Sequence, residues 1–310
     1  MRIAVLGAGG VGAYYGGLLA RAGHDVVLLA RGANLEALRS RALEVRTPEG
    51  AFTVAVEATG DASGLGCVDL AIVAVKTYSL AQIAPAAARA AVAGAIVVPL
   101  LNGVEAAEAL VRAGVPSGAV LGGLTQVSAV RTAPGVVERR SPFQRVVVGE
   151  MAGGFSERAE RVAAAFRAAG ADASASPDVT AELWRKLAFI APMAAACGLS
   201  RSPVGPILSL PLGTLLVERA VRETFAVARA LGVALGGQDE EESRTIAFIR
   251  SLPGGLKPSF LLDLEAGGPT EIDDLCGAVS RLGRRAGVPT PVHDTAAAAL
   301  SVAAPGAGPA

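Results

Sequence analysis

The chain has 310 residues, 52% of them hydrophobic, which is long for one core and comfortable for two domains. Its formal net charge is +0 and its isoelectric point is near 6.8, so it offers no basic surface for nucleic acid or for an anionic membrane, and we exclude both as partners. The three separated cysteines, Cys67, Cys197 and Cys276, fit a reducing compartment, and no segment is typical of a signal peptide or membrane span, so we expect a cytoplasmic protein.

The first elements are a strand, a glycine-rich turn, a helix and a second strand. Arg2–Leu6 and Asp25–Leu29 have the apolar composition of buried strands, and a helix is expected over Val11–Ala22. The turn reads Gly7-Ala8-Gly9-Gly10-Val11-Gly12. In this setting the first glycine permits a tight turn, the second lets the backbone approach a pyrophosphate, and the third allows close packing of helix on strand. Because the helix N-terminus adds amide donors for phosphates, the unit predicts a dinucleotide-binding site.

The end of the second strand distinguishes NAD from NADP. An NAD site uses an Asp or Glu there to accept a hydrogen bond from the ribose hydroxyl, but this chain reads Leu28-Leu29-Ala30-Arg31. A guanidinium at Arg31 suits the 2′-phosphate of NADP instead. The alternative is a solvent-facing arginine in an arginine-rich protein, and the sequence favours NADP.

Strands and helices continue to alternate after the second strand. Asp69–Val75 and Ala95–Leu100 read as buried strands, and Leu80–Ala91 reads as the helix between them. Lys76 follows the first strand directly, and Asn102 lies two residues after the second. Because ligands of parallel sheets bind beyond the carboxyl ends of the strands, we expect both side chains near a nicotinamide and its substrate.

A change of pattern marks the domain boundary. Strand-like segments over Ala119–Val130 and Arg145–Gly149 enclose a turn at Pro134-Gly135, and a helix over Glu157–Ala169 leads to a Ser/Ala/Pro stretch that ends at Pro177. We therefore predict an α/β protein, with an N-terminal NADP-binding Rossmann-type parallel sheet over 1–176 and an all-helical substrate domain over 177–302. The Ala/Pro/Gly tail 303–310 is expected to be flexible. Predicted helices of the second domain are Ala181–Leu199, Leu212–Leu231, Gln238–Ser251, Ser259–Glu265, Glu271–Ala286 and Asp294–Val302.

Lys186 is the strongest catalytic candidate in the helical part. The chain has three lysines, Lys76, Lys186 and Lys257, against a sum of 28 lysines and arginines, so a retained lysine has a chemical reason more often here than elsewhere. Arginine does not release a proton at useful pH, whereas a partly desolvated lysine does. With two histidines, His24 and His293, the chain has little material for a histidine metal site or triad, and we expect no metal.

These residues together resemble the ketopantoate reductase (2-dehydropantoate 2-reductase) family. The resemblance rests on Gly7-x-Gly9-x-x-Gly12, Arg31, Lys76, Leu101-Asn102-Gly103-Val104, Trp184-x-Lys186-Leu187, Ser259 with Asp263, and Thr270-Glu271-Ile272-Asp273. It implies NADPH-dependent reduction of 2-dehydropantoate to pantoate, a step of pantothenate biosynthesis, in a cleft between the two domains.

The resemblance also implies a role for each candidate residue. Lys186 would be the general acid and Glu271 its acidic partner. Asn102 would orient the carbonyl or the nicotinamide, Ser259 would bind the substrate carboxylate, and Lys76 would lie near the nicotinamide ribose. Two plainer interpretations stay open: Glu271 in the first turn of a helix, and Ser259 as a helix N-cap.

One departure from the family concerns the substrate. The family usually has asparagines four and eight residues after the lysine, where this chain has Ile190 and Ala194, and a further family asparagine falls near Val204. Apolar residues in place of hydrogen-bonding ones relax or redirect the choice of a hydroxylated substrate. The alternative function is therefore a related dehydrogenase or imine reductase for a more hydrophobic carbonyl, alcohol or amine.

Two further alternatives concern activity and assembly. A redox sensor that binds NADP without turnover is the hypothesis of a different class, and the retained Lys186, Glu271, Asn102 and Ser259 argue against it. Helical C-terminal domains of this kind often pair, so a homodimer stands beside a monomer among the expectations.

Overall fold

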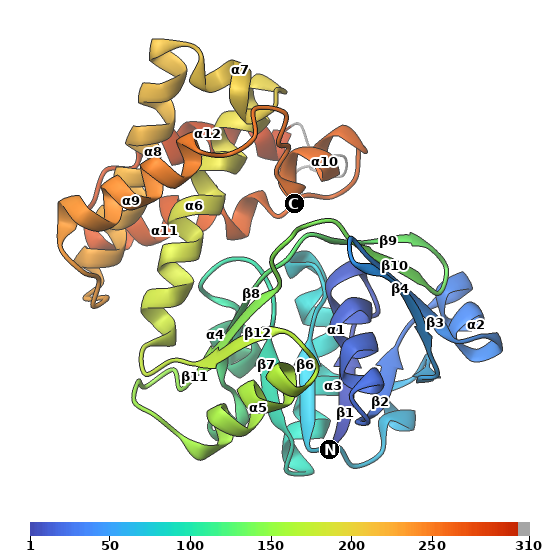
Figure 1. Ribbon diagram of the computed structural model, residues 1–310. Coiled ribbons are helices and arrows are strands. Elements are labelled where there is room, and N and C mark those ends of the chain that lie inside the picture. Colours follow the sequence, from blue (N-terminus) through green and yellow to red (C-terminus); the bar gives the residue numbers. More distant parts are fainter. Residues whose placement is uncertain (303–310) are drawn as a thin grey trace. The chain divides into compact units, whose positions relative to one another are not determined.

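The computed structural model describes residues 1–302, and Figure 1 traces their helices and strands. The chain divides into two compact units, which we call the N-terminal unit (residues 1–101 and 106–179) and the helical unit (residues 102–105 and from Thr180 on). The predicted boundary after residue 176 lies close to this division, whereas the membership of 102–105 in the helical unit was not predicted. The predicted flexible tail 303–310 lies outside the described residues.

A parallel sheet forms the centre of the N-terminal unit (Figure 1). Its five strands pair in the order β5-β2-β1-β6-β7, and every pairing is parallel. The predicted Rossmann-type sheet is therefore confirmed. The strands are β1 (Arg2–Leu6), β2 (Asp25–Leu29), β5 (Glu57–Thr59), β6 (Leu70–Val73) and β7 (Ile96–Pro99).

Alternating side chains of these strands build two separate cores. On β1, Ile3 and Val5 join one apolar cluster, while Ala4 and Leu6 join another, because successive residues of a strand point to opposite faces. Helices α1 and α5 contribute to the first cluster, and α3 and α4 contribute to the second. The helices of this unit are α1 (Gly10–Arg21), α2 (Gly32–Ser40), α3 (Leu80–Val92), α4 (Ala106–Arg112) and α5 (Glu157–Ala168), with 3-10 turns η1 (Ala62–Leu65), η2 (Thr77–Ser79) and η3 (Ser117–Ala119).

Two smaller sheets complete the N-terminal unit. One has the order β4-β3-β10-β9, and the other has the order β12-β11-β8. Their strands are β3 (Leu43–Thr47), β4 (Gly50–Val54), β8 (Gly122–Gln126), β9 (Ala129–Ala133), β10 (Val136–Arg139), β11 (Arg145–Gly149) and β12 (Asp172–Ala175). The hairpin β3–β4 and strand β10 were not predicted.

The strand-like segment predicted over Ala119–Val130 contains β8 and the start of β9, two strands that belong to different sheets. β8 pairs with β11, whereas β9 pairs with β10. The change occurs at Ser128, whose amide donates to Ser141 Oγ at 3.0 Å and whose carbonyl accepts from the Arg140 amide at 2.7 Å. These bonds direct the chain away from β11 and along β10.

The helical unit is built around α6 (Val179–Ser200). Residues of α6 enter two apolar clusters, one with Leu187 and Ala191 and the other with Ala188 and Met193, so the middle of this helix is surrounded by others. The remaining elements are α7 (Val204–Leu208), α8 (Pro211–Ala230), α9 (Gln238–Arg250), α10 (Ser259–Glu265), η4 (Ile272–Asp274), α11 (Cys276–Ala286) and α12 (Pro291–Val302).

The predicted continuous helix over 271–286 is wrong. Glu271 precedes the short turn η4, and Leu275 has φ −103° and ψ −96°, outside helical geometry, before α11 begins at Cys276. The reason is local packing: a Cβ on Gly103 would lie 2.8 Å from the carbonyl oxygen of Asp274, so the 102–105 loop is pressed against η4. A regular helix over 271–286 would not place the Asp274 carbonyl against the 102–105 loop.

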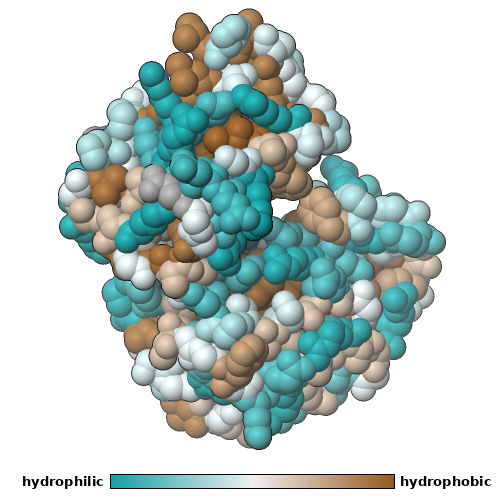
Figure 2. All heavy atoms as spheres, turned by 60° about the vertical axis from the view of Figure 1, so that its left-hand side comes forward, coloured by the Kyte–Doolittle hydropathy of each residue, from teal (hydrophilic) through white to brown (hydrophobic). Residues whose placement is uncertain are grey.

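The surface mixes polar and apolar side chains, as Figure 2 shows on one face. Large apolar side chains that stay exposed on the helical unit include Leu210, Leu212 and Leu262. Across residues 1–302, none of the helices combines the length and the apolar character that crossing a membrane requires.

Candidate active site

The glycine turn after β1 combines tight packing with one bare stretch of backbone. Gly7 has φ +117°, and a Cβ there would lie 2.6 Å from Val75 Cγ1. A Cβ on Gly12 would lie 2.0 Å from the Gly7 carbonyl oxygen. By contrast, a Cβ on Gly9 would meet nothing within 4 Å. Two glycines thus serve the fold, and the third leaves its backbone open for a ligand to approach.

The N-terminus of α1 follows this turn directly. The helix begins at Gly10, has no acidic residue in its first turn, and its early backbone bond runs from the Ala13 amide to the Gly9 carbonyl at 2.9 Å. The amides before Ala13 therefore lack helical acceptors and suit a phosphate. The residues present fit the pyrophosphate of a dinucleotide.

Gly10 has a further role that the sequence analysis missed. A Cβ on it would lie 2.0 Å from the carbonyl oxygen of Ala129, because β9 passes over the start of α1. Gly10 occupies a variable position of the glycine pattern, so the motif gave no signal for this contact.

Arg31 follows β2 and is the N-cap residue of α2. Its side chain is exposed, and its Nη1 donates to Gln82 Oε1 at 3.3 Å. The guanidinium is thus accessible at the same edge of the sheet as the glycine turn, since both follow neighbouring parallel strands. Lys76 reaches this edge too: it comes shortly after β6, is half-buried, and its carbonyl accepts from the Ser79 amide at 2.8 Å.

Asn34 joins the cofactor-binding segments and was not anticipated. It lies on α2 and is 6% exposed. Its Nδ2 donates to the Ala8 carbonyl at 3.1 Å, and its Oδ1 accepts from the Gly135 amide at 2.9 Å. One buried amide therefore fixes the glycine turn relative to the β9–β10 turn. A single asparagine near a helix start carries no sequence signal for such a role.

Lys186, Asn102 and Glu271 form a hydrogen-bonded cluster within the helical unit. The Lys186 ammonium donates to Asn102 Oδ1 at 2.9 Å, and Asn102 Nδ2 donates to Glu271 Oε2 at 3.1 Å. Lys186 is 8% exposed and Glu271 is 5% exposed. The Asn102 amide thus lies between the two charged groups and forms one hydrogen bond with the Lys186 ammonium and one with the Glu271 carboxylate.

Burial sets the acidity of Lys186. Desolvation lowers the pKa of Lys186 to about 8, and the charge of the Glu271 carboxylate acts in the opposite direction. An ammonium with a pKa near 8 gives up its proton far more readily than an ordinary lysine, while it is still mostly charged at neutral pH. The cluster therefore holds a proton donor suited to a developing alkoxide.

The loop 102–105 reaches the cluster because it packs with the helices. Gly103 has φ +89°, which few other residues adopt, and Val104 packs against the apolar cluster that includes Leu187. Arg281 pairs with Glu105 at 2.5 Å. These contacts hold Asn102 beside Lys186, whereas the predicted domain boundary placed Asn102 in the sheet domain.

The remaining candidates lie at different depths. Ser259 is the exposed first residue of α10, whose N-cap is Pro258, so the alternative that Ser259 caps this helix is wrong. Within residues 1–302 no hydrogen bond joins Ser259 to the Lys186 cluster. Ile190 is half-buried one turn after Lys186, while Ala194 is 0% exposed and lies in the core. Of these two, Ile190 is the one with surface to offer a ligand.

Comparison with known proteins gives the same picture along the whole chain. The family model described as ketopantoate reductase PanE/ApbA matches residues 3–153, and its C-terminal counterpart matches residues 178–304. An uncharacterized oxidoreductase, YkpB of Bacillus subtilis, is 33% identical over 97% of this chain and 98% of its own length. The 2-dehydropantoate 2-reductase of Halobacterium salinarum is 33% identical over 96% of this chain and 97% of its own.

Solved structures resemble the chain to a similar extent. The 2-dehydropantoate 2-reductase of Geobacter metallireducens covers 98% of this chain and 100% of its own, with a TM-score of 0.91 and 31% identity. A D-mandelate dehydrogenase solved with NADH and anilino(oxo)acetate covers 98% of each chain, with a TM-score of 0.88 and 22% identity, which shows a shared fold.

Proposed function

The chain belongs to the ketopantoate reductase family of oxidoreductases, and on this basis we propose that it reduces a 2-oxo acid to a 2-hydroxy acid with NADPH, most simply 2-dehydropantoate to pantoate. The observation that carries the proposal is the buried Lys186 ammonium, which donates to Asn102 and whose pKa is raised by the charge of Glu271. The place in metabolism that follows is pantothenate synthesis. Cytoplasmic location and a homodimer stay predictions.

Lys186 supplies the proton of the proposed reaction. A bound nicotinamide supplies the hydride for the carbonyl carbon, and the carbonyl oxygen then needs a proton. An ammonium has three donors, and within residues 1–302 Lys186 uses one of them, on Asn102. The other two remain to bind the substrate oxygen and to deliver a proton as negative charge develops there.

Asn102 and Glu271 orient this donor. Because Asn102 Oδ1 accepts from Nζ, rotation of the ammonium is restricted, and Glu271 in turn fixes the amide through Nδ2. The nearby carboxylate favours the charged form of Lys186 against the desolvation that opposes it. The cluster therefore keeps the donor protonated and aimed.

NADP is supported by the residue at the end of β2. Ala30-Arg31 stands where an NAD-binding chain has its acid, and the exposed guanidinium suits a phosphate. The glycine turn and the start of α1 fit the pyrophosphate of either cofactor, so the preference rests on Arg31.

A more apolar 2-oxo acid is the second candidate substrate, because Ile190 is half-buried one turn after Lys186. An isoleucine there cannot donate or accept a hydrogen bond with a substrate hydroxyl. The same scaffold in the D-mandelate dehydrogenase, solved with anilino(oxo)acetate, is compatible with an apolar acid. Related dehydrogenation or imine reduction would use the same proton donor.

The deciding experiment compares NADPH oxidation with 2-dehydropantoate and with 2-oxoisovalerate, which lacks the 4-hydroxyl. A higher kcat/KM for 2-dehydropantoate supports the pantoate assignment. A higher value for 2-oxoisovalerate supports the apolar acid, and Ile190→Asn should then move the ratio toward 2-dehydropantoate. Tight NADPH binding without turnover of any 2-oxo acid or other carbonyl would favour the sensor over both.

A further inference from the structure

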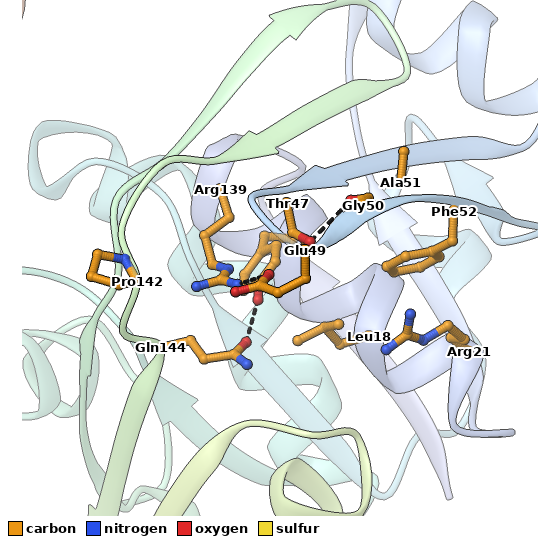
Figure 3. Close-up of a pocket in the computed structure, with 11 residues that line it drawn as sticks. Leu18, Arg21, Thr47, Glu49, Gly50, Ala51, Phe52, Arg139, Pro142 and Gln144 are labelled. Atoms are coloured by element: carbon orange, nitrogen blue, oxygen red, sulfur yellow. Dashed lines mark hydrogen bonds and ion pairs between the residues drawn. The ribbon is translucent and has the colours of Figure 1, made fainter.

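A pocket of about 460 Å³ lies on the flank of α1 in the N-terminal unit (Figure 3). Tyr14, Leu18 and Arg21 contribute one side of it from successive turns of the helix. Arg21 stands 11 residues after Gly10, about 16 Å along the helix axis. The pocket therefore extends along α1 from Tyr14, one turn after Gly10, to Arg21 at the end of the helix, and no residue of the glycine turn lines it.

Arg139 lines this pocket and carries a buried donor without an acceptor. Its side chain is 3% exposed, its Nη1 donates to the Ser141 carbonyl at 2.5 Å, and its Nη2 pairs with Glu49. The third donor, Nε, is buried, and no acceptor for it exists among residues 1–302. Buried donors without an acceptor are rare in folded proteins, so the guanidinium of Arg139 is incompletely hydrogen-bonded by its present neighbours.

The anion that Arg139 now uses is a replaceable one. Glu49 lies in the turn between β3 and β4, and its side chain is 65% exposed. A buried guanidinium is always charged and requires an anion, whereas an exposed carboxylate on a hairpin turn is well solvated without its partner. Figure 3 shows the Glu49 carboxylate reaching back over Arg139 from this turn. An entering anion can thus exchange with Glu49 without leaving an isolated buried charge.

The other end of the pocket is cationic and apolar. The Arg21 guanidinium lies 4.1 Å from the centroid of the Phe52 ring and has no ion pair among residues 1–302. Leu18 lies beside them in Figure 3. The charged groups that line the pocket are Arg21 and Arg139 against Glu49, an excess of one positive charge. A flat apolar body suits the ring and the leucine, and a single negative charge suits the arginines.

We propose that this pocket is a second ligand site, which binds a small organic carboxylate whose anionic group takes the place of Glu49 on Arg139 while its apolar body packs against Leu18 and Phe52. Tyr14 forms the polar wall beside the carboxylate position, where its hydroxyl donates to Gln144. The Gln144 amide is itself fixed, since Nε2 donates to the Gly170 carbonyl at 2.9 Å. This wall is therefore held in place by its own hydrogen bonds.

Calorimetric titration with benzoate tests the proposal, using the full chain saturated with NADP⁺. Glu49→Gln removes the competing carboxylate and should tighten benzoate binding by about tenfold, because a charge-assisted pair no longer has to be broken. Arg21→Ala should weaken binding by about fivefold, through loss of the cation at the far end. Matched controls are Glu36→Gln and Arg39→Ala, two exposed changes on α2 that should leave the affinity unchanged.

Three results would overturn the proposal. Absence of benzoate binding to both the original chain and Glu49→Gln is one, and equal affinity across all variants is another. Inorganic phosphate that competes with benzoate at equal affinity would show that the apolar body adds nothing. Each readout is binding rather than turnover, so its failure is independent of the proposed reductase activity.

Discussion

Two buried cations, Lys186 in the helical unit and Arg139 in the N-terminal unit, differ in the charge of their direct hydrogen-bond partner. The Lys186 ammonium donates to a neutral amide, and the carboxylate of Glu271 is one residue further away, beyond Asn102. The Arg139 guanidinium pairs directly with the carboxylate of Glu49. The positive charge of Lys186 therefore has no carboxylate in direct contact, whereas the positive charge of Arg139 is balanced by the carboxylate of Glu49.

The difference shows what each cation is suited to do. A buried lysine without a direct ion pair has a lowered pKa and can give up its proton, which general acid catalysis needs. An arginine keeps its charge under all useful conditions, so a buried arginine needs an anion in its surroundings. One position is built to release a proton and the other to hold an anion.

The largest expected effect comes from exchanging the lysine. Lys186→Ala should lower kcat by about 10²–10⁴-fold, and Lys186→Arg should not restore it, because a guanidinium cannot donate the proton. Steady-state NADPH oxidation measures kcat, and fluorescence measures whether NADPH binding is retained. The reverse exchange, Arg139→Lys, should leave kcat nearly unchanged. Substantial turnover by Lys186→Arg would refute the role of general acid.

The next largest expected effect is a change in the free energy of unfolding with pH, caused by the buried ammonium of Lys186. Because the pKa of Lys186 is lowered from 10.5 to about 8, the unfolded chain binds the extra proton between these values. The cost of the buried ammonium is therefore present below about pH 8 and disappears toward pH 10.5. Relative to Lys186→Met, the free energy of unfolding should rise by roughly 2–3 kcal/mol from pH 7 to pH 10.

Chemical denaturation at both pH values measures this difference. Lys257 pairs with Glu265 at 2.7 Å on the surface, so Lys257→Met is a matched control with little change across the window. Parallel pH curves for the original chain and Lys186→Met would mean that the ammonium is not desolvated.

Arg31 provides an exposed cation for the same comparison. Arg31→Ala should raise the KM for NADPH by about 10–100-fold and leave the KM for NADH nearly unchanged, since one charge-assisted phosphate contact is lost. Initial rates measured with each cofactor give the ratio of the KM for NADPH to the KM for NADH. Arg39→Ala, on the same helix, is the control. Equal losses with NADPH and NADH would exclude a 2′-phosphate contact.

The smallest expected effect concerns Glu271. Its charge raises the pKa of Lys186 against desolvation, so Glu271→Gln should move the alkaline limb of the kcat profile from near pH 8 to lower pH. A profile of kcat between pH 6 and pH 10 measures it. Asp273→Asn, an exposed change in η4, should not move the limb. An unshifted limb in Glu271→Gln would assign the titration to another group.

Local pattern was sufficient for most of the parallel sheet and the long helices. Strands Arg2–Leu6 and Asp25–Leu29 were predicted to the residue, since apolar runs between turns need no partner to be recognised. The hairpin β3–β4 was missed, because its strands, LEVRT and GAFTV, mix polar and apolar residues and lack the continuous apolar run of β1 and β2. The break at Leu275 was missed because it depends on the loop that packs against η4.

The sequence by itself determined the family, the sheet domain with its glycine turn, and the residue types Lys186, Asn102 and Glu271, because these are carried by composition and spacing along the chain. Only the tertiary structure decided that Asn102 leaves the sheet domain and stands between the lysine and the carboxylate. It also decided the lowered pKa of Lys186 and the pairing of Arg139 with Glu49. Hydrogen bonds and desolvation act through space between residues far apart in sequence, so no local pattern encodes them.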